Sequence, residues 1–189
     1  FISTFAFALV GAKVAALKGM DYAGITFVAG VSALSGGTFR NFALQTQVAW
    51  LHQPYLLLAV LLAVIVVLTF SRKPIGKFAV TLDSIGLSFS AIAGVNLSLE
   101  HKVSFFAALI LGVLSAVLGS LTRDVLCQTP PVLLHRETNG TAAFAGALLY
   151  AIMYKTNVQI ALASAIAGIL VISIRLVSIR YKWNLPTIK

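Results

Sequence analysis

The stretch SGGTFRN at residues 35–41 decides how this chain is organised. It lies inside an apolar segment, about 22–46, that is long enough to cross a lipid bilayer. Within that segment, two glycines, two hydroxyl groups, an arginine and an amide replace the aliphatic side chains that lipid favours. These residues predict a membrane helix that bends at its glycines and directs its polar side chains toward protein or water.

The same pattern occurs a second time, 83 residues further along the chain and without a gap in the alignment. The matched pairs are Gly11 with Gly94, Ser32 with Ser115, Ala33 with Ala116, Gly36 with Gly119, Arg40 with Arg123, and Asn41 with Asp124. We therefore expect two copies of a membrane helix that contains glycines and an arginine.

Composition places the chain in a membrane. It has 189 residues, of which 59% are hydrophobic and only 10% are charged, whereas soluble domains carry about 25% charged residues. The net charge of +9 is explained by basic cytoplasmic loops, so no nucleic-acid partner is expected. The single cysteine, Cys127, excludes an internal disulfide. Because the first residue is Phe1 rather than Met, we expect that further residues precede it.

The hydropathy pattern predicts an all-α integral membrane protein with seven transmembrane helices in a single domain, 1–189. The segments are about 1–17, 22–46, 54–70, 78–98, 103–127, 138–154 and 157–179. Three spans separate equivalent positions, so the two copies run in opposite directions. This predicts an inverted 3+3 repeat, with repeat 1 at about 1–72, repeat 2 at about 77–155, and a seventh helix at about 157–179.

Basic residues in the loops predict the orientation of the chain. One side of the membrane receives two basic loop residues, Lys102 and Lys155. The other side receives eight, namely Lys18, Arg72, Lys73, Lys77, Arg136, Arg180, Lys182 and Lys189. By the positive-inside rule, the second side is cytoplasmic. The N-terminus is then outside and the C-terminus is inside.

The glycines allow two interpretations. Gly36 and Gly37 could form a hinge that bends the second helix and turns backbone carbonyls toward a pore. They could instead allow close packing of two helices, for which Gly30, Ala33 and Gly37 are suitably spaced. In the second copy Gly119 is followed by Ser120, which predicts a milder bend in the fifth helix.

Arg40 and Arg123 are the charged residues of greatest interest, because a charge inside the bilayer normally has a partner or faces water. Asp124 and Asp83 are candidate partners, although Asp83 could also hold a cation or complement a helix dipole. Asn41 is neutral, so Arg40 must pair across helices, bond to carbonyls or reach water. Alternatively, both arginines extend to the membrane surface from near helix ends.

Other polar groups are less specific. Lys13 in the first helix is a candidate charge partner or a side chain that extends to the surface. Thr38 belongs to a large set of hydroxyl residues, some of which we expect to line a polar path. The three histidines show no metal-ligand spacing, and there is no nucleotide-binding or hydrolase motif. An enzyme is therefore not expected, and the sequence alone identifies no metal site.

Several ordered motifs resemble the prokaryotic branch of the trimeric intracellular cation channel (TRIC) family and the related small bacterial membrane proteins with the same paired domain. In the first half they are residues 5–12, 18–21 and 36–40. In the second half they are residues 83–87, 93–94, 119–126, 130–134 and 136–137. The chain departs from the family pattern at Asn41, where Asp is usual, and at Ser120, where a second Gly is usual.

The resemblance implies a homotrimer in a bacterial or archaeal plasma membrane, with one pore in each protomer that conducts K⁺ and Na⁺ passively. No cofactor is implied beyond the permeant ions and bound membrane lipid. The expected pore or gating residues are Gly36, Gly37, Thr38, Arg40, Gly119, Ser120, Arg123 and Asp124. The alternative is a secondary transporter of a small solute such as an amino acid, because inverted repeats also suit alternating access. A scaffold without transport activity would leave the membrane-embedded arginines unexplained.

Overall fold

The computed structural model describes residues 1–70, 77–129 and 139–181, with the side chains of 77–79 also left out. All elements in these ranges are helices, and no strand occurs among them. The helices are α1 (Ile2–Leu17), α2 (Tyr22–Ala43), α3 (Ala49–His52), α4 (Pro54–Phe70), α5 (Lys77–Glu100), α6 (Phe105–Leu126), α8 (Asn139–Lys155) and α9 (Ile160–Tyr181).

The protein is a multi-pass membrane protein. Four helices are long and apolar enough to cross a bilayer, namely α2, α5 from Val80, α6 and α9. The helices α1 and α4 are apolar but shorter, with 16 and 17 residues. Each of the seven predicted segments coincides with one helix to within a few residues, although the number of true spans stays a prediction. The four-residue α3 was not predicted.

The 83-residue repeat extends to the ends of α2 and α6. The Asp21 carboxylate accepts from Gly24 N at 2.7 Å where α2 begins, and the equivalent Ser104 accepts from Ala107 N at 3.4 Å where α6 begins. Both helices stop before a residue with positive φ, Gln45 at 54° and Gln128 at 48°. The two copies therefore share their capping geometry as well as their glycines.

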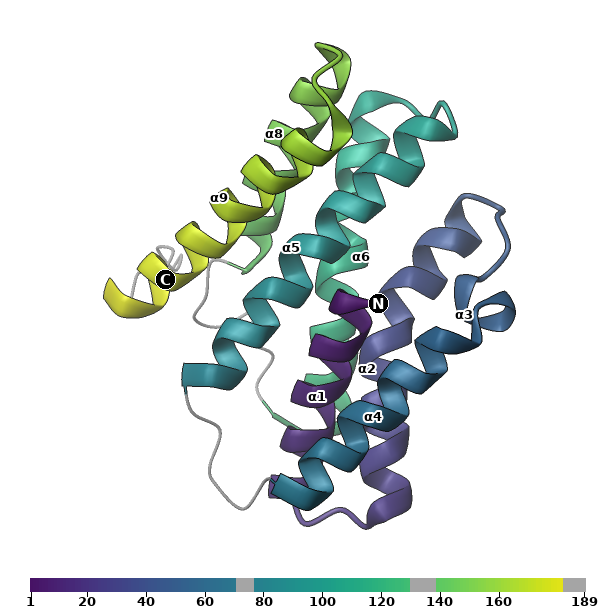
Figure 1. The fold of residues 1–189 in the computed structure, drawn as a ribbon, viewed down its shortest axis with the longest axis vertical. Coiled ribbons are helices and arrows are strands. Elements are labelled where there is room, and N and C mark those ends of the chain that lie inside the picture. Colours follow the sequence, from purple (N-terminus) through teal and green to yellow (C-terminus); the bar gives the residue numbers. More distant parts are fainter. Residues whose placement is uncertain (71–76, 130–138, 182–189) are drawn as a thin grey trace, which may run out of the picture.

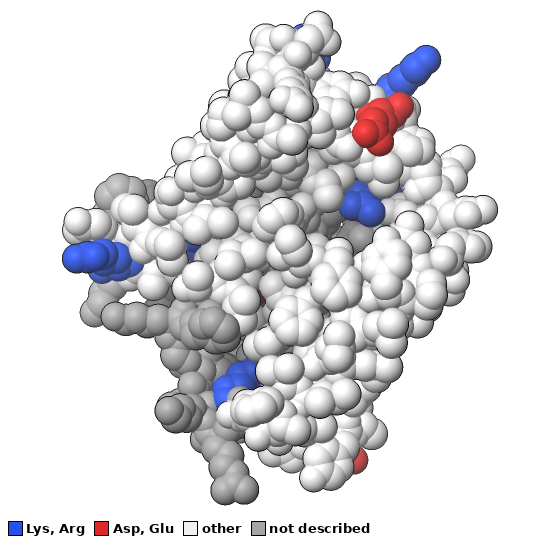
Figure 2. Space-filling view, viewed as in Figure 1, with Lys and Arg blue, Asp and Glu red and all other residues white. Residues whose placement is uncertain are grey.

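The helices form two groups that meet at the α2–α6 and α1–α5 contacts (Figure 1). In the first group α1 packs against α2 and α4, and in the second α5 packs against α6 and α8. The helix α9 packs against α5 and α8, so it covers only the second group. Figure 2 shows that the visible face is largely uncharged, with basic and acidic residues in a few separate patches, as expected for a surface in contact with lipid.

Neither α2 nor α6 is interrupted at its glycines. The α-helix continues through Gly36 and Gly37, and through Gly119 and Ser120. The predicted bends at these positions therefore stay predictions.

Several of the basic residues that predicted the orientation lie outside the described residues. The basic residues concerned are Arg72, Lys73, Arg136, Lys182 and Lys189, and the side chain of Lys77. Residues 130–134 and 136–137, which contribute to the family resemblance, also lie there.

Candidate functional site

The helices α2 and α6 cross at two equivalent glycines. A Cβ atom added to Gly119 would lie 2.5 Å from the Ser32 carbonyl oxygen, and one added to Gly36 would overlap the Ser115 carbonyl oxygen. Each copy therefore contributes one glycine and one serine carbonyl to the same contact. This close approach needs glycine at both positions, which favours the packing interpretation for Gly36 and Gly119.

Hydroxyl groups bond across the same crossing. Ser32 Oγ lies 3.2 Å from Gly119 O and 3.3 Å from Phe7 O. Ser90 Oγ donates to Ser115 O at 2.9 Å. The crossing therefore combines backbone carbonyls and hydroxyl groups from both repeats in a region otherwise packed with small apolar residues.

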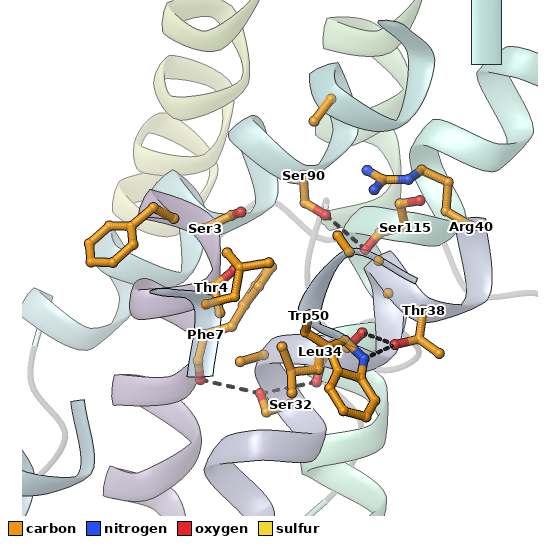
Figure 3. Close-up of a pocket in the computed structure, with 18 of the residues that line it drawn as sticks. Ser3, Thr4, Phe7, Ser32, Leu34, Thr38, Arg40, Trp50, Ser90 and Ser115 are labelled. Carbon is orange, nitrogen blue, oxygen red and sulfur yellow. Dashed lines mark hydrogen bonds between the residues drawn. The ribbon is translucent and has the colours of Figure 1, made fainter. Parts of the chain in front are cut away.

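A cavity of about 220 Å³ opens beside the crossing, at the end of the bundle that holds Arg40 (Figure 3). We call this end the Arg40 end and the opposite one the Arg123 end. The cavity is large enough to hold several water molecules. Its hydroxyl lining consists of Ser3, Thr4, Ser32, Thr38, Ser90 and Ser115. Ser115 Oγ is buried and has no hydrogen-bond partner among the described residues, so the cavity lining retains an unused polar group.

Arg40 lines this cavity and bonds to its neighbour in sequence. Its Nε and Nη2 donate to Asn41 Oδ1 at 3.0 and 2.7 Å. Asn41 Nδ2 in turn donates to Gln47 O at 2.6 Å. The guanidinium is thus oriented by an amide that carries no charge. No ion pair to Arg40 is found among the described residues.

At the mouth of the same cavity, Trp50 Nε1 donates to Thr38 Oγ1 at 3.0 Å. Thr38 Oγ1 also donates to Leu34 O, one turn earlier in α2, at 2.7 Å. These bonds tie the segment around α3 to α2 next to Gly37, where an added Cβ would meet open space. Gly37 therefore faces the cavity, whereas Gly36 packs against the backbone of α6 at Ser115.

Arg123 occupies a closed ionic cluster instead of a cavity. Its Nε lies 2.9 Å from Asp124 Oδ1, and its Nη1 lies 2.9 Å from Asp83 Oδ1. Arg175 Nη2, from α9, lies 3.9 Å from Asp83 Oδ2. All four side chains are buried. Two acids and two bases therefore compensate one another, as a low-dielectric interior requires.

The structure brings together most of the predicted residues, but at two places. The cavity gathers Gly36, Gly37, Thr38, Arg40 and Gly119. The ionic cluster gathers Arg123 with its two candidate partners, Asp124 and Asp83. Arg40 instead bonds to the Asn41 side chain of its own helix, which was not among the three possibilities expected for it.

The remaining residues lie elsewhere. Ser120 is buried and donates to Val117 O at 2.9 Å, inside its own helix. Lys13 is buried in α1, with 8% exposure. Arg175 and Trp50 were not predicted as site residues. Arg175 could have been found, because a basic residue within the apolar segment 157–179 carries the same signal as Arg40 and Arg123.

Metal chemistry finds no support in the described part of the chain. No group of three or more His, Cys, Asp or Glu side chains is close enough there to hold a metal ion.

Comparison with known proteins identifies the relatives of this fold. A family model described as "Glycine transporter" matches residues 1–72 and 80–155. The inner membrane protein YadS of Escherichia coli K12, assigned to UPF0126, is 31% identical over 98% of this chain and 92% of its own length. The UPF0126 membrane protein YvgT of Bacillus subtilis is 27% identical, with 98% and 92% coverage.

Solved structures with a similar fold come from TRIC channels. A TRIC trimeric intracellular cation channel orthologue from Rhodobacter sphaeroides has a TM-score of 0.91 at 29% identity, covering 96% of this chain and 95% of that one. A structure described as explaining conductance through TRIC cation channels has a TM-score of 0.88 at 32% identity, with 100% and 94% coverage. The resemblance to TRIC proteins and their bacterial relatives is therefore confirmed, and the fold is that of a channel family rather than of an enzyme.

Proposed function

For this chain, which belongs to the family described as "Glycine transporter" and shares its fold with TRIC cation channels, we propose passive conduction of small monovalent cations, K⁺ and Na⁺, across the membrane. The path runs inside a single protomer, between the two repeats. The polar cavity beside the α2–α6 crossing is the observation that carries this proposal.

Oxygen atoms at the crossing supply the chemistry that a cation needs. Carbonyls and hydroxyls can replace part of the hydration shell of a small ion. Within the described part of the chain the Ser115 hydroxyl has no other hydrogen-bond partner, so it can contact an ion or its water. Arg40 also lines the cavity and sets a barrier to cations there. Its displacement from the path, or screening by an anion, would lower that barrier.

The assembly and orientation are also proposals. One solved relative is described as trimeric, which supports a homotrimer with a separate path in each protomer and lipid around it. A plasma-membrane location with the N-terminus outside is supported by the name of the inner membrane relative and by the loop charges.

Planar-bilayer recording of the purified protein in a KCl gradient tests the proposal. Unitary currents that reverse near the K⁺ potential are expected. The variant Arg40→Gln keeps a long polar side chain but removes the charge, so it should raise the unitary conductance. A bilayer that stays silent with folded, inserted protein would contradict cation conduction.

A second function is favoured by the lining of the cavity. Among its described lining residues Arg40 is the one formal side-chain charge, and none is Asp or Glu. An arginine suits a carboxylate, the volume suits a solute of a few heavy atoms, and the matched family is described as a glycine transporter. Saturable uptake of radiolabelled glycine into proteoliposomes, lost in Arg40→Gln, would establish transport of a small amino acid. Uptake without saturation would exclude it.

A further inference from the structure

Phe7 of α1 and Ser90 of α5 occupy equivalent positions in the two repeats, 83 residues apart, but differ in chemistry. At the Arg40 end, Ser90 lines the cavity and bonds to Ser115 O. A two-fold relation between the repeats would place an equivalent volume beside Phe7, on the side of the crossing that faces the Arg123 end. The side chain that occupies this second volume decides whether the path is continuous.

The ring of Phe7 fills that volume. Its nearest atoms lie 3.2 Å from the position of a Cβ on Gly86 and 3.6 Å from that of a Cβ on Gly119. The residue is 3% exposed. It shares a buried cluster with Leu87, Ala116 and other apolar residues of α5, α6, α8 and α9. The two glycines leave room for an aromatic ring between α5 and α6, where any larger side chain would displace it.

The ring also separates the two polar regions described above. Phe7 is itself a lining residue of the cavity and is labelled in Figure 3. Gly119 lies one helical turn before Arg123, and Gly86 lies three residues after Asp83. Phe7 therefore stands between the cavity and the ionic cluster.

We propose that Phe7 is the barrier of this path: an apolar constriction that keeps the Arg40-end cavity sealed from the Arg123 end until α1 moves. An apolar constriction blocks ions by excluding the water that must accompany them. The inference rests on the proposed function in one respect, namely that the path lies between the two repeats. It places a steric barrier on α1, in addition to the electrostatic barrier that Arg40 sets.

Accessibility of a cysteine at Ser90 tests the barrier without relying on transport. Ser90→Cys is placed in a Cys127→Ser background and exposed to an anionic, membrane-impermeant methanethiosulfonate reagent. The reagent is applied from either side, using spheroplasts and inverted membrane vesicles. With Phe7 in place, labelling should be at least tenfold faster from the Arg40 end. With Phe7→Ser, which copies the residue of the other repeat, the two rates should become similar.

Matched variants separate a barrier from a general loss of packing. Phe7→Leu keeps an apolar side chain and should preserve the difference between the two sides. Phe27→Ser makes the same substitution on the exposed surface of α2, where Phe27 is 61% exposed, and should also preserve it. If Phe7→Ser fails to insert, Phe7→Ala provides the same comparison. Equal labelling with Phe7 present, or no change in a folded Phe7→Ser protein, would overturn the proposal.

Flux through the same proteins distinguishes the barrier from the proposed function. In proteoliposomes, Phe7→Ser should raise K⁺ efflux at least tenfold over Phe27→Ser. Changed accessibility without K⁺ flux in any variant would support the barrier and contradict cation conduction. K⁺ flux that is the same in all variants, together with unchanged accessibility, would contradict the barrier and leave cation conduction standing.

Discussion

The Arg40 end and the Arg123 end of this molecule are built from equivalent helices, yet one is open and the other is closed. At the Arg40 end, the guanidinium contacts a neutral amide and lines a cavity. At the Arg123 end, the equivalent guanidinium contacts two carboxylates and is buried. The backbone pattern is shared, so the difference comes from a few side chains and from what covers them.

The helix α9 accounts for part of this difference. It lies outside the repeat, packs against α5 and α8, and brings Arg175 to Asp83. In the described structure, no additional helix packs against α1, α2 and α4 in the way that α9 packs against α5 and α8. Two halves with a matching sequence pattern can therefore differ in structure when a single added helix covers one of them.

The largest expected effect comes from breaking the ionic cluster. Asp83→Asn removes the carboxylate that contacts both Arg123 and Arg175, and should lower the free energy of unfolding by about 3–5 kcal/mol. The matched control is Asp21→Asn at the exposed start of α2, where Asn also caps a helix and the loss should be only a few tenths of a kcal/mol. Steric trapping in bicelles measures both. Equal losses would show that the cluster adds no particular stability.

The next effect tests the helix crossing. Gly36→Ala forces α2 away from the Ser115 carbonyl and should cost about 1–3 kcal/mol of unfolding free energy. Gly37→Ala, one residue further, meets open space and should stabilise the helix by up to about 1 kcal/mol. The same unfolding assay compares them. A destabilised Gly37→Ala protein would favour a hinge at this position instead.

A smaller effect is expected at the mouth of the cavity. Trp50→Phe removes the hydrogen bond to Thr38 and should cost about 1 kcal/mol. The equivalent position in the second repeat is Leu133, which lies outside the described residues. Because a leucine side chain has no N–H to donate, the second repeat has no counterpart of the Trp50 indole at this position. A double-mutant cycle with Thr38→Val isolates the bond. A coupling energy near zero would mean that it contributes nothing to stability.

The smallest effect concerns the hydroxyl pair that joins α2 to α6. Ser35 Oγ and Thr122 Oγ1 lie 3.1 Å apart, and a hydrogen bond of this kind in a membrane is worth about 0.6 kcal/mol. Ser35→Ala should therefore lower unfolding free energy by about that amount. Thr26→Ala removes a hydroxyl that bonds only within its own helix turn and serves as the control. A loss above about 2 kcal/mol would point to a larger polar network here.

Helix boundaries could be predicted from the sequence because the length of each apolar segment limits where a helix can end. The largest errors were of three residues: α2 stops at Ala43 rather than near residue 46, and α9 begins at Ile160 rather than near residue 157. At α2 the cause is visible. The end of this helix is decided by the positive φ of Gln45, a local conformation that hydropathy does not report. The short α3 was missed for the same reason, since four residues carry no periodic signal.

The sequence predicted which residues belong to the site better than it predicted how those residues are arranged in space. The charged residues inside apolar segments revealed Arg40, Arg123 and Asp83, because their cost in lipid requires a partner. Which helix supplies that partner depends on how each helix is rotated, and this is settled by packing. Sequence alone therefore could not separate the cavity from the ionic cluster, nor choose packing over bending for Gly36.

The α2–α6 contact has a consequence for the ancestry of the fold. It consists of two equivalent half-contacts, Gly36 with Ser115 and Gly119 with Ser32, and in each helix the serine precedes the glycine by four residues. A single three-helix unit carrying this pair could make the whole contact with an upside-down copy of itself. Such a unit would need to insert into the membrane in both orientations. Duplication and fusion of its gene would then release each half to diverge, as the two ends of this protein have done.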